Sequence, residues 1–175
     1  MKQLKYHNFI SHKGFTAGYL TETKERALET FKMHHKEEPK LAYLSTTPAS
    51  IRDLLNKTFT KVEKLDNSIL FTSPEGCYFL HHEQVCCEEV WIESIVGDLD
   101  DLMNSPILLA DEIISNMEGA DKSSTYTFYK LATIKGYVDI RWVGESNGFY
   151  SETVDIRFIP KESLTCLNSL TKEKK

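Results

Sequence analysis

From about residue 57 to residue 160, apolar and polar residues alternate in short runs, and each run ends in residues that favour turns. A period of two places every second side chain on the same face of a sheet. Consecutive runs of this kind predict an antiparallel sheet. The expected strands have the sequences KTFTKVEKL, SILFTS, CYFLHH, VWIESIV, PILLADEII, TYTFYKLATI, YVDIRWV and FYSETVDIRFI.

The first 57 residues show helical spacing instead. Between residues 23 and 38, Ala27, Leu28 and Phe31 fall on one side of a helix, and charged residues occupy the other side. Pro39 follows this stretch, and the residue before a proline is disfavoured in the helical conformation. The spacing therefore predicts a helix that ends before Pro39.

A second, shorter helix is expected directly before the strands. Thr47 is a good capping residue, and Pro48 suits the first helical position. Ile51, Leu54 and Leu55 then form one apolar face. Two short helices with such narrow apolar stripes need another surface on which to pack.

These patterns predict an α+β fold, which is predominantly an antiparallel β-sheet with an N-terminal helical extension. We expect the extension to cover residues 1–57 and the β domain to cover residues 58–160. Residues 161–175 end in the polar sequence SLTKEKK and are expected to form a flexible tail.

One hairpin allows a prediction of strand register. If Lys135 and Gly136 form a two-residue loop, Ile134 lies opposite Tyr137. The same register places Lys130 directly opposite Arg141. Tyr129, Leu131 and Thr133 then face the core together with their partners on the next strand.

Two cations opposite one another repel unless an anion lies between them. One solution is a solvated face on which Asp139 pairs with the cations. The other is a bound phosphate, because arginine offers a planar fork and lysine a point charge. Phe128 and Tyr137 share this face and are expected to stack on a base.

The next connection is expected to be another hairpin, with a loop over residues 145–147 closed by Gly148. This loop follows the strand that carries Arg141. Asn147 has two interpretations: its amide contacts a ligand, or it is the left-handed residue that asparagine commonly supplies before glycine.

The segment HHEQVCCEEV concentrates residues with reactive side chains. His81 and His82 point to opposite faces of a strand, so they cannot act together. One of them is expected to hydrogen-bond within a pocket and the other to lie at the surface. Cys86 and Cys87 are adjacent, whereas structural zinc sites usually separate their cysteines by two to four residues. The sequence therefore does not favour a metal site. The common interpretation of such cysteines is that they are small buried apolar residues.

Composition narrows the classes of partner. The chain has 175 residues, a formal net charge of −5 and a pI near 5.7, so binding to a nucleic-acid polymer is not expected. No run of about 20 apolar residues predicts a membrane span, and the polar N-terminus does not resemble a signal peptide. We expect a cytoplasmic protein whose four cysteines are thiols. These are Cys77, Cys86, Cys87 and Cys166.

Two alternatives stay open beside a binding protein. In the first, the chain is an enzyme that degrades a nucleotide, with His82 as general base and the acidic turn at residues 98–101 holding a metal ion. No motif of a known catalytic class accompanies these residues. In the second, the helices of residues 1–57 form the contact surface of a protein–protein inhibitor.

Several motifs between residues 52 and 157 resemble a family of short phage and bacterial proteins catalogued as a domain of unknown function. The matching residues are His82, Gln84, Cys86, Cys87 and Glu88; Gly97, Asp98, Leu99, Asp101 and Leu102; Thr127, Phe128 and Tyr129; and Ile140, Arg141, Trp142, Gly144 and the run 146–151. This family is similar to the anti-Thoeris sponge family, whose phage proteins sequester signals cyclised from ADP-ribose. The segment before residue 52 departs from its short members.

The resemblance implies a viral protein that evades anti-phage defence in the cytoplasm of a bacterial host. It implies a homo-oligomer that binds cyclic ADP-ribose isomers, and in some members cyclic oligonucleotides, at subunit interfaces without cleaving them or needing a cofactor. Arg141, Phe128 and Asn147 are the contacts that it implies. Together with the residue chemistry, the expected ligand-binding set is Arg141, Lys130, Phe128, Tyr137, Asn147 and His82.

Overall fold

The computed structural model describes residues 4–118 and 123–165. The strands of this part of the chain are β1 (Lys5–Ile10), β2 (Thr16–Thr21), β3 (Leu41–Tyr43), β4 (Thr47–Pro48), β5 (Lys61–Lys64), β6 (Ser68–Ser73), β7 (Gly76–His81), β8 (Glu89–Val96), β9 (Leu109–Glu118), β10 (Ser123–Ala132), β11 (Tyr137–Ser146), β12 (Asp155–Pro160) and β13 (Leu164–Thr165). The α-helix is α1 (Lys24–His35), and the 3-10 helices are η1 (Ile51–Leu54), η2 (Leu99–Leu102) and η3 (Lys161–Ser163). Within these ranges no helix is long and apolar enough to cross a membrane.

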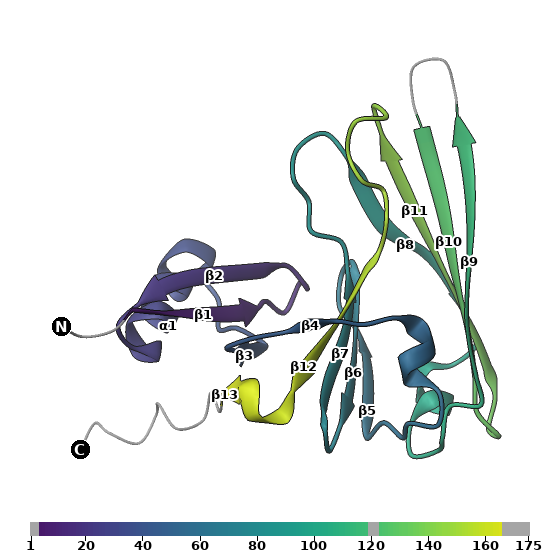
Figure 1. Cartoon of the computed structure of the whole chain (residues 1–175), viewed down its shortest axis with the longest axis horizontal. Coiled ribbons are helices and arrows are strands. Elements are labelled where there is room, and N and C mark those ends of the chain that lie inside the picture. The colour runs from purple at the N-terminus through teal and green to yellow at the C-terminus, as the bar shows by residue number, and fades with distance from the viewer. Residues whose placement is uncertain (1–3, 119–122, 166–175) are drawn as a thin grey trace.

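The strands form three antiparallel sheets that lie in successive layers (Figure 1). The first sheet has the order β13-β3-β1-β2, the second β4-β12-β7-β6-β5, and the third β8-β11-β10-β9. The predominance of antiparallel sheet is therefore confirmed. Helix α1 packs on the first sheet, and the second sheet lies between the first and the third.

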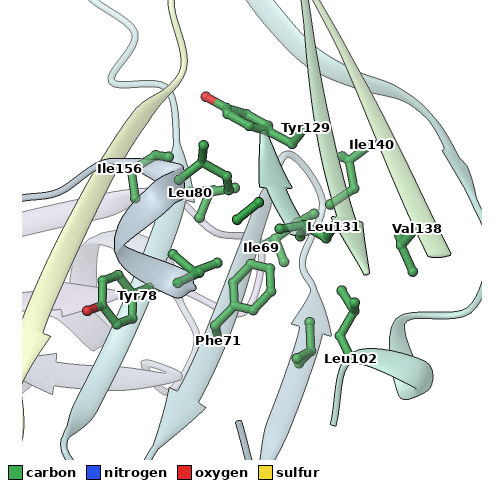
Figure 2. Close-up of a cluster of buried hydrophobic side chains, with 14 of the residues drawn as sticks. Ile69, Phe71, Tyr78, Leu80, Leu102, Tyr129, Leu131, Val138, Ile140 and Ile156 are labelled. Carbon is green, nitrogen blue, oxygen red and sulfur yellow. The ribbon is translucent and has the colours of Figure 1, made fainter. Parts of the chain in front are cut away.

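The largest core fills the space between the second and third sheets (Figure 2). Its side chains come from alternate positions of facing strands, as the two-residue period of a sheet requires. The labelled members in Figure 2 are Ile69, Phe71, Tyr78, Leu80, Leu102, Tyr129, Leu131, Val138, Ile140 and Ile156. This core fixes the third sheet, whose outer face and strand ends carry most of the predicted site residues.

The second sheet is buried on both faces. Leu70 and Phe79 point away from the main core and pack against Ile10 of the first sheet. On the far side of the first sheet, Phe9 packs against Phe31 of α1, with ring centroids 5.2 Å apart. Consecutive residues such as Phe9 and Ile10 are therefore both buried, each in a different core.

Helix α1 confirms the predicted helix. Thr23 is its N-cap, and the Thr23 side chain accepts a hydrogen bond from the backbone N–H of Arg26. Ala27 and Phe31 on the expected stripe are buried. The helix ends before Pro39, because Lys36 adopts a left-handed conformation with φ 56° and closes the last turn.

The remainder of residues 1–57 corrects the expectation of a helical extension. The predicted helix at residue 47 is wrong, since Thr47–Pro48 form strand β4 beside β12, and only the 3-10 turn η1 follows. Ser50, not Thr47, begins that turn, and its backbone N–H donates to Asp53. The start of the predicted tail is also structured, as η3 and β13, whereas residues 166–175 and Cys166 lie outside the described residues.

The predicted register of β10 and β11 is wrong by two residues. Ala132, not Ile134, lies opposite Tyr137, so the loop has four residues, and Lys130 lies opposite Asp139 rather than Arg141. The cause is a set of contacts with η2. The Thr133 hydroxyl donates to the carbonyl of Asp101 over 2.6 Å and accepts the backbone N–H of Lys135. These contacts hold Thr133 within the turn.

The observed register predicts a measurable coupling between Lys130 and Asp139. Opposite charges directly across a strand pair stabilise a sheet by roughly 0.2–1 kcal/mol. A double-mutant cycle with alanine at both positions, followed by urea denaturation, is expected to give a favourable coupling of that size. The matched cycle for Lys130 and Arg141 should give no coupling. A repulsive coupling between these two cations would contradict the observed register and support the register of a two-residue loop.

The hairpin expected after β11 is absent. Strand β12 does not pair with β11 but lies between β4 and β7 in the second sheet. Residues 147–154 therefore cross from the third sheet to the second. This crossing brings a polar segment to the end of β11, where the candidate site lies.

Candidate ligand-binding site

The six residues predicted to bind a ligand fall in three places. Phe128, Lys130, Tyr137 and Arg141 lie on β10 and β11, on the face of the third sheet that points away from the second. Asn147 follows the end of β11, and His82 follows the end of β7.

On the outer face, Arg141 has partners of its own. Its guanidinium carbon lies 4.8 Å from the ring centroid of Tyr126 and 5.6 Å from that of Phe128, as in a cation–π contact. Its Nε atom lies 2.7 Å from Oε2 of Glu93. Arg141 therefore already has two aromatic neighbours and a carboxylate that faces the cation.

Lys130 is also surrounded by acidic residues, since the register places Asp139 and Asp111 on either side of it. The predicted pair of adjacent cations is therefore wrong. The physical reason is the four-residue loop, which moves Arg141 opposite Phe128. That these side chains contact a ligand stays a prediction.

A cavity of about 420 Å³ opens where β8 begins and β11 ends. Two segments far apart in the sequence converge on it, because β8 pairs with β11. The lining residues are Gln84, Cys87, Glu88, Glu89, Glu145, Ser146 and Asn147. All but Glu89 and Glu145 belong to the two motifs His-x-Gln-x-Cys-Cys-Glu and Ser-Asn-Gly, so the polar motifs of this chain meet at one place.

Glu88 organises the first of these segments. The residue is 3% exposed, and its carboxylate accepts the backbone N–H groups of Val85 and Cys86. These hydrogen bonds, the Val85 one first, lower the pKa of Glu88 despite its removal from water. The Gln84 side chain also donates to the Glu88 carbonyl over 3.1 Å. The turn is therefore held at both ends.

His82 connects this turn to the crossing segment. Its Nδ1 lies 2.9 Å from the carbonyl oxygen of Thr153, which accepts only, so Nδ1 carries the proton. Its Nε2 lies 3.5 Å from Oε1 of Glu88. A proton on Nε2 would turn this contact into an ion pair. His81, the other member of the pair, stacks on Phe79 at 4.5 Å between centroids.

Asn147 serves the turn after β11 and also lines the cavity. Its Oδ1 accepts the backbone N–H of Phe149 over 3.1 Å, and Gly148 has a φ of 84°. The Ser146 hydroxyl accepts the N–H of Gly148 over 2.9 Å. Asn147 is thus a turn residue, as one interpretation predicts. Its amide NH₂ donates to no described residue, and this group is available to a ligand.

Glu152 is a buried acidic residue that the sequence interpretation missed. It is 7% exposed, and it accepts hydrogen bonds from the hydroxyls of Ser123, Thr125 (2.7 Å) and Ser146 (2.6 Å). Removal from water raises its pKa, but these hydrogen bonds together lower it below the usual value. The sequence did contain an indication that Glu152 is buried. Its even number places it on the expected core face with Val154 and Ile156.

The cavity is rich in acceptors. Glu89 and Glu145 lie directly opposite each other on β8 and β11. Like charges at such positions destabilise a strand pair unless a cation or hydrogen-bond donor lies near them. The cavity therefore suits hydroxyl, amino or cationic groups of a ligand, and a phosphate would be repelled from its rim.

The DUF7448 domain of unknown function matches the chain over residues 52–156. The chain belongs to this family. All the residues that line the cavity, from Gln84 to Asn147, fall within the matched range. It leaves β1 to β4 and α1 outside. No curated protein and no solved structure matches the chain.

Two further cavities line the seam between the DUF7448 domain and the N-terminal strands. One, of about 400 Å³, includes His82 and Gln84 together with Lys13 and Phe15. The other, of about 480 Å³, includes His81 and Arg157 among its lining residues. Residues 81–88 thus contribute to three neighbouring cavities, and His82 lies in the second of them rather than beside Asn147.

The residues of the enzyme alternative lie apart. Asp98 caps η2 by accepting the N–H of Asp100, and η2 contacts the turn that precedes β11. His82 lies near the other end of β11, about 30 Å away for a ten-residue strand. This arrangement contradicts a joint site of His82 and the acidic turn. Within the described ranges, no three His, Cys, Asp or Glu side chains gather as potential metal ligands.

Proposed function

We propose that this chain is a non-catalytic binding protein that captures a cyclic nucleotide-derived signal, such as a cyclic ADP-ribose isomer, at the cavity beside Asn147. The observation that carries the proposal is the convergence of the two polar motif segments on one cavity. Its volume of about 420 Å³ falls in the range of small-molecule sites. The resemblance to the anti-Thoeris sponge family suggests the ligand class.

The cavity chemistry suits the sugar and base of such a ligand. Ribose hydroxyls and the exocyclic amine of adenine are donors, and the carboxylates of Glu89 and Glu145 accept them. The NH₂ group of Asn147 adds a donor for a ring nitrogen or a carbonyl oxygen. Because the rim is anionic, the phosphates of the ligand must lie elsewhere.

Arg141 is our candidate for the phosphates. It precedes Glu145 by four residues on the same face of β11, which is about 13 Å along a strand. Its ion pair with Glu93 is half exposed, at 39% and 40%, and such pairs contribute little. A diphosphate would therefore replace Glu93 at low cost, and the guanidinium would bind it as a fork. Tyr126 and Phe128 hold the arginine in place.

Capture without cleavage is tested by recovering the signal. Purified protein is mixed with a cyclic ADP-ribose isomer, unbound ligand is removed by ultrafiltration, and the retained fraction is heated and analysed by mass spectrometry. We expect the retained ligand to be released intact. Release of a cleaved product would support the enzyme alternative, and no retention of any cyclic ADP-ribose isomer, cyclic dinucleotide or cyclic trinucleotide would refute the proposal.

A variant pair tests the role of Arg141 in the same assay. Arg141→Ala is expected to retain at least about tenfold less ligand, since charge-assisted hydrogen bonds are worth about 1.5–3 kcal/mol. Arg52→Ala, which removes an exposed arginine from η1, is the matched control and should retain as much as the unaltered protein. Equal retention of ligand by both variants would contradict the assignment of Arg141 as the phosphate-binding residue.

A further inference from the structure

Cys86 and Cys87 form a vicinal thiol pair at the cavity. Both side chains are exposed, and their Sγ atoms lie 3.0 Å apart. A disulfide bond is about 2.05 Å long, so an approach of about 1 Å would join them. The expectation that these two cysteines are small buried residues is therefore wrong, although it holds for Cys77, which is 2% exposed.

The turn around Glu88 is the reason that the two sulfurs meet. In a strand, consecutive side chains point to opposite faces. Here the buried Glu88 carboxylate accepts the N–H groups of Val85 and Cys86, which bends the chain ahead of the strand β8. The side chains of Cys86 and Cys87 consequently lie on the same side of the turn.

We propose that Cys86 and Cys87 are a reversible redox site that closes to a vicinal disulfide by exchange with a small-molecule disulfide such as oxidised glutathione. The Cys86 thiolate attacks one sulfur of that disulfide, which forms a mixed disulfide and releases one thiol. Cys87 loses its proton and attacks the Cys86 sulfur, which releases the second thiol. The protein loses two electrons and two protons, and the small disulfide is reduced to two thiols.

The surroundings favour Cys86 as the attacking group. Hydrogen bonds from Cys87 and from Tyr150 lower the pKa of the Cys86 thiol, whereas the same contact with Cys86 raises the pKa of Cys87. Both thiols are reachable by a small disulfide because both are exposed. Cys77 is shielded within the second core, and burial raises the pKa of its thiol.

The redox site has a consequence for the cavity, and this consequence rests on the proposed function. Cys87 is one of the lining residues, so bond formation draws part of the cavity wall toward Cys86. The 84–88 turn also carries Gln84 and Glu88, which line the same space. We expect the disulfide form to bind a cyclic ADP-ribose isomer at least about tenfold more weakly, a difference of about 1.4 kcal/mol.

Intact mass spectrometry tests the redox site without any ligand. Full-length protein carrying Cys77→Ser and Cys166→Ser retains only the vicinal pair. After treatment with oxidised glutathione it should show a loss of about 2 Da, the mass of the two hydrogens removed by the exchange. Adding Cys87→Ser should instead leave a stable glutathione adduct on Cys86.

Two outcomes would overturn the redox site. One is that the vicinal pair stays unreacted, and the other is that it ends as a double glutathione adduct. Phenylarsine oxide, which bridges closely spaced thiols, should react with the reduced pair and not with the oxidised one. Equal ligand affinity in both redox forms would overturn only the effect of the disulfide on ligand binding, not the redox site itself. If the proposed function fails because no cyclic nucleotide binds, the mass spectrometry result would be unchanged.

Discussion

Replacing Phe71 with alanine is expected to lower the free energy of unfolding by about 3–5 kcal/mol. Phe71 is fully buried on β6 and points into the core between the second and third sheets (Figure 2). Its ring lies 5.2 Å from that of Phe59, with an angle of 63° between the planes. Truncation removes this aromatic contact and leaves a cavity that the surrounding strands fill only in part.

Urea denaturation of both proteins measures the loss. Phe149→Ala is the matched control, because Phe149 is 91% exposed and its removal should change stability by less than about 0.5 kcal/mol. If Phe71→Ala were as mild as Phe149→Ala, the second and third sheets would not share the core described above.

The second large effect concerns Glu152, whose replacement by alanine is expected to cost roughly 2–4 kcal/mol. The change leaves the hydroxyls of Ser123, Thr125 and Ser146 without their acceptor at a site that is largely buried from water. Gly144 increases the effect, because its position has no room for a side chain: an added Cβ would lie 2.6 Å from the Glu152 carbonyl oxygen. The crossing segment is therefore closely seated on β11 and cannot move to compensate.

The effect of Glu152 has a defined pH dependence. Its pKa is lower in the folded protein than in the unfolded chain, so its contribution is present above the unfolded value of about 4.3. The contribution is lost as the pH falls through the lower, folded pKa. The difference in stability between the unaltered protein and Glu152→Ala should therefore narrow in acid. Glu145→Ala, an exposed neighbour on β11, should show a much smaller difference, and equal costs for both would contradict the anchoring role.

The sequence predicted those helices and strands that are determined by residues close together in the chain. Helix α1 follows from a capping residue, Thr23, and the spacing of Ala27 and Phe31, all within the same few turns. Strand β11 follows from its alternation of apolar and polar residues, and β6 and β7 follow from short apolar runs between turn residues. The N-terminal strands lack this signal, because β1 lies between a helix and a sheet and buries Phe9 and Ile10 on opposite faces.

Features that depend on distant contacts were out of reach. The length of the β10–β11 loop is decided by the hydrogen bond from Thr133 to the Asp101 carbonyl, and nothing near residue 133 reveals it. The same holds for the site. The sequence singled out Cys87 and Asn147, but their meeting at one cavity depends on the pairing of β8 with β11, whereas His82 lines a neighbouring cavity.

Calorimetric titration with a cyclic ADP-ribose isomer tests most directly whether the cavity beside Asn147 is the binding site. Asn147→Asp keeps the oxygen that accepts the Phe149 N–H, removes the NH₂ donor and adds charge to an already anionic rim. Asn116→Asp makes the same change at an exposed position on β9 that does not line the cavity, and it likewise keeps an accepting oxygen, here for the Thr125 hydroxyl. We predict saturable binding to the unaltered protein and to Asn116→Asp, and binding at least about tenfold weaker to Asn147→Asp. Equal affinity in all three proteins would contradict the assignment of this cavity.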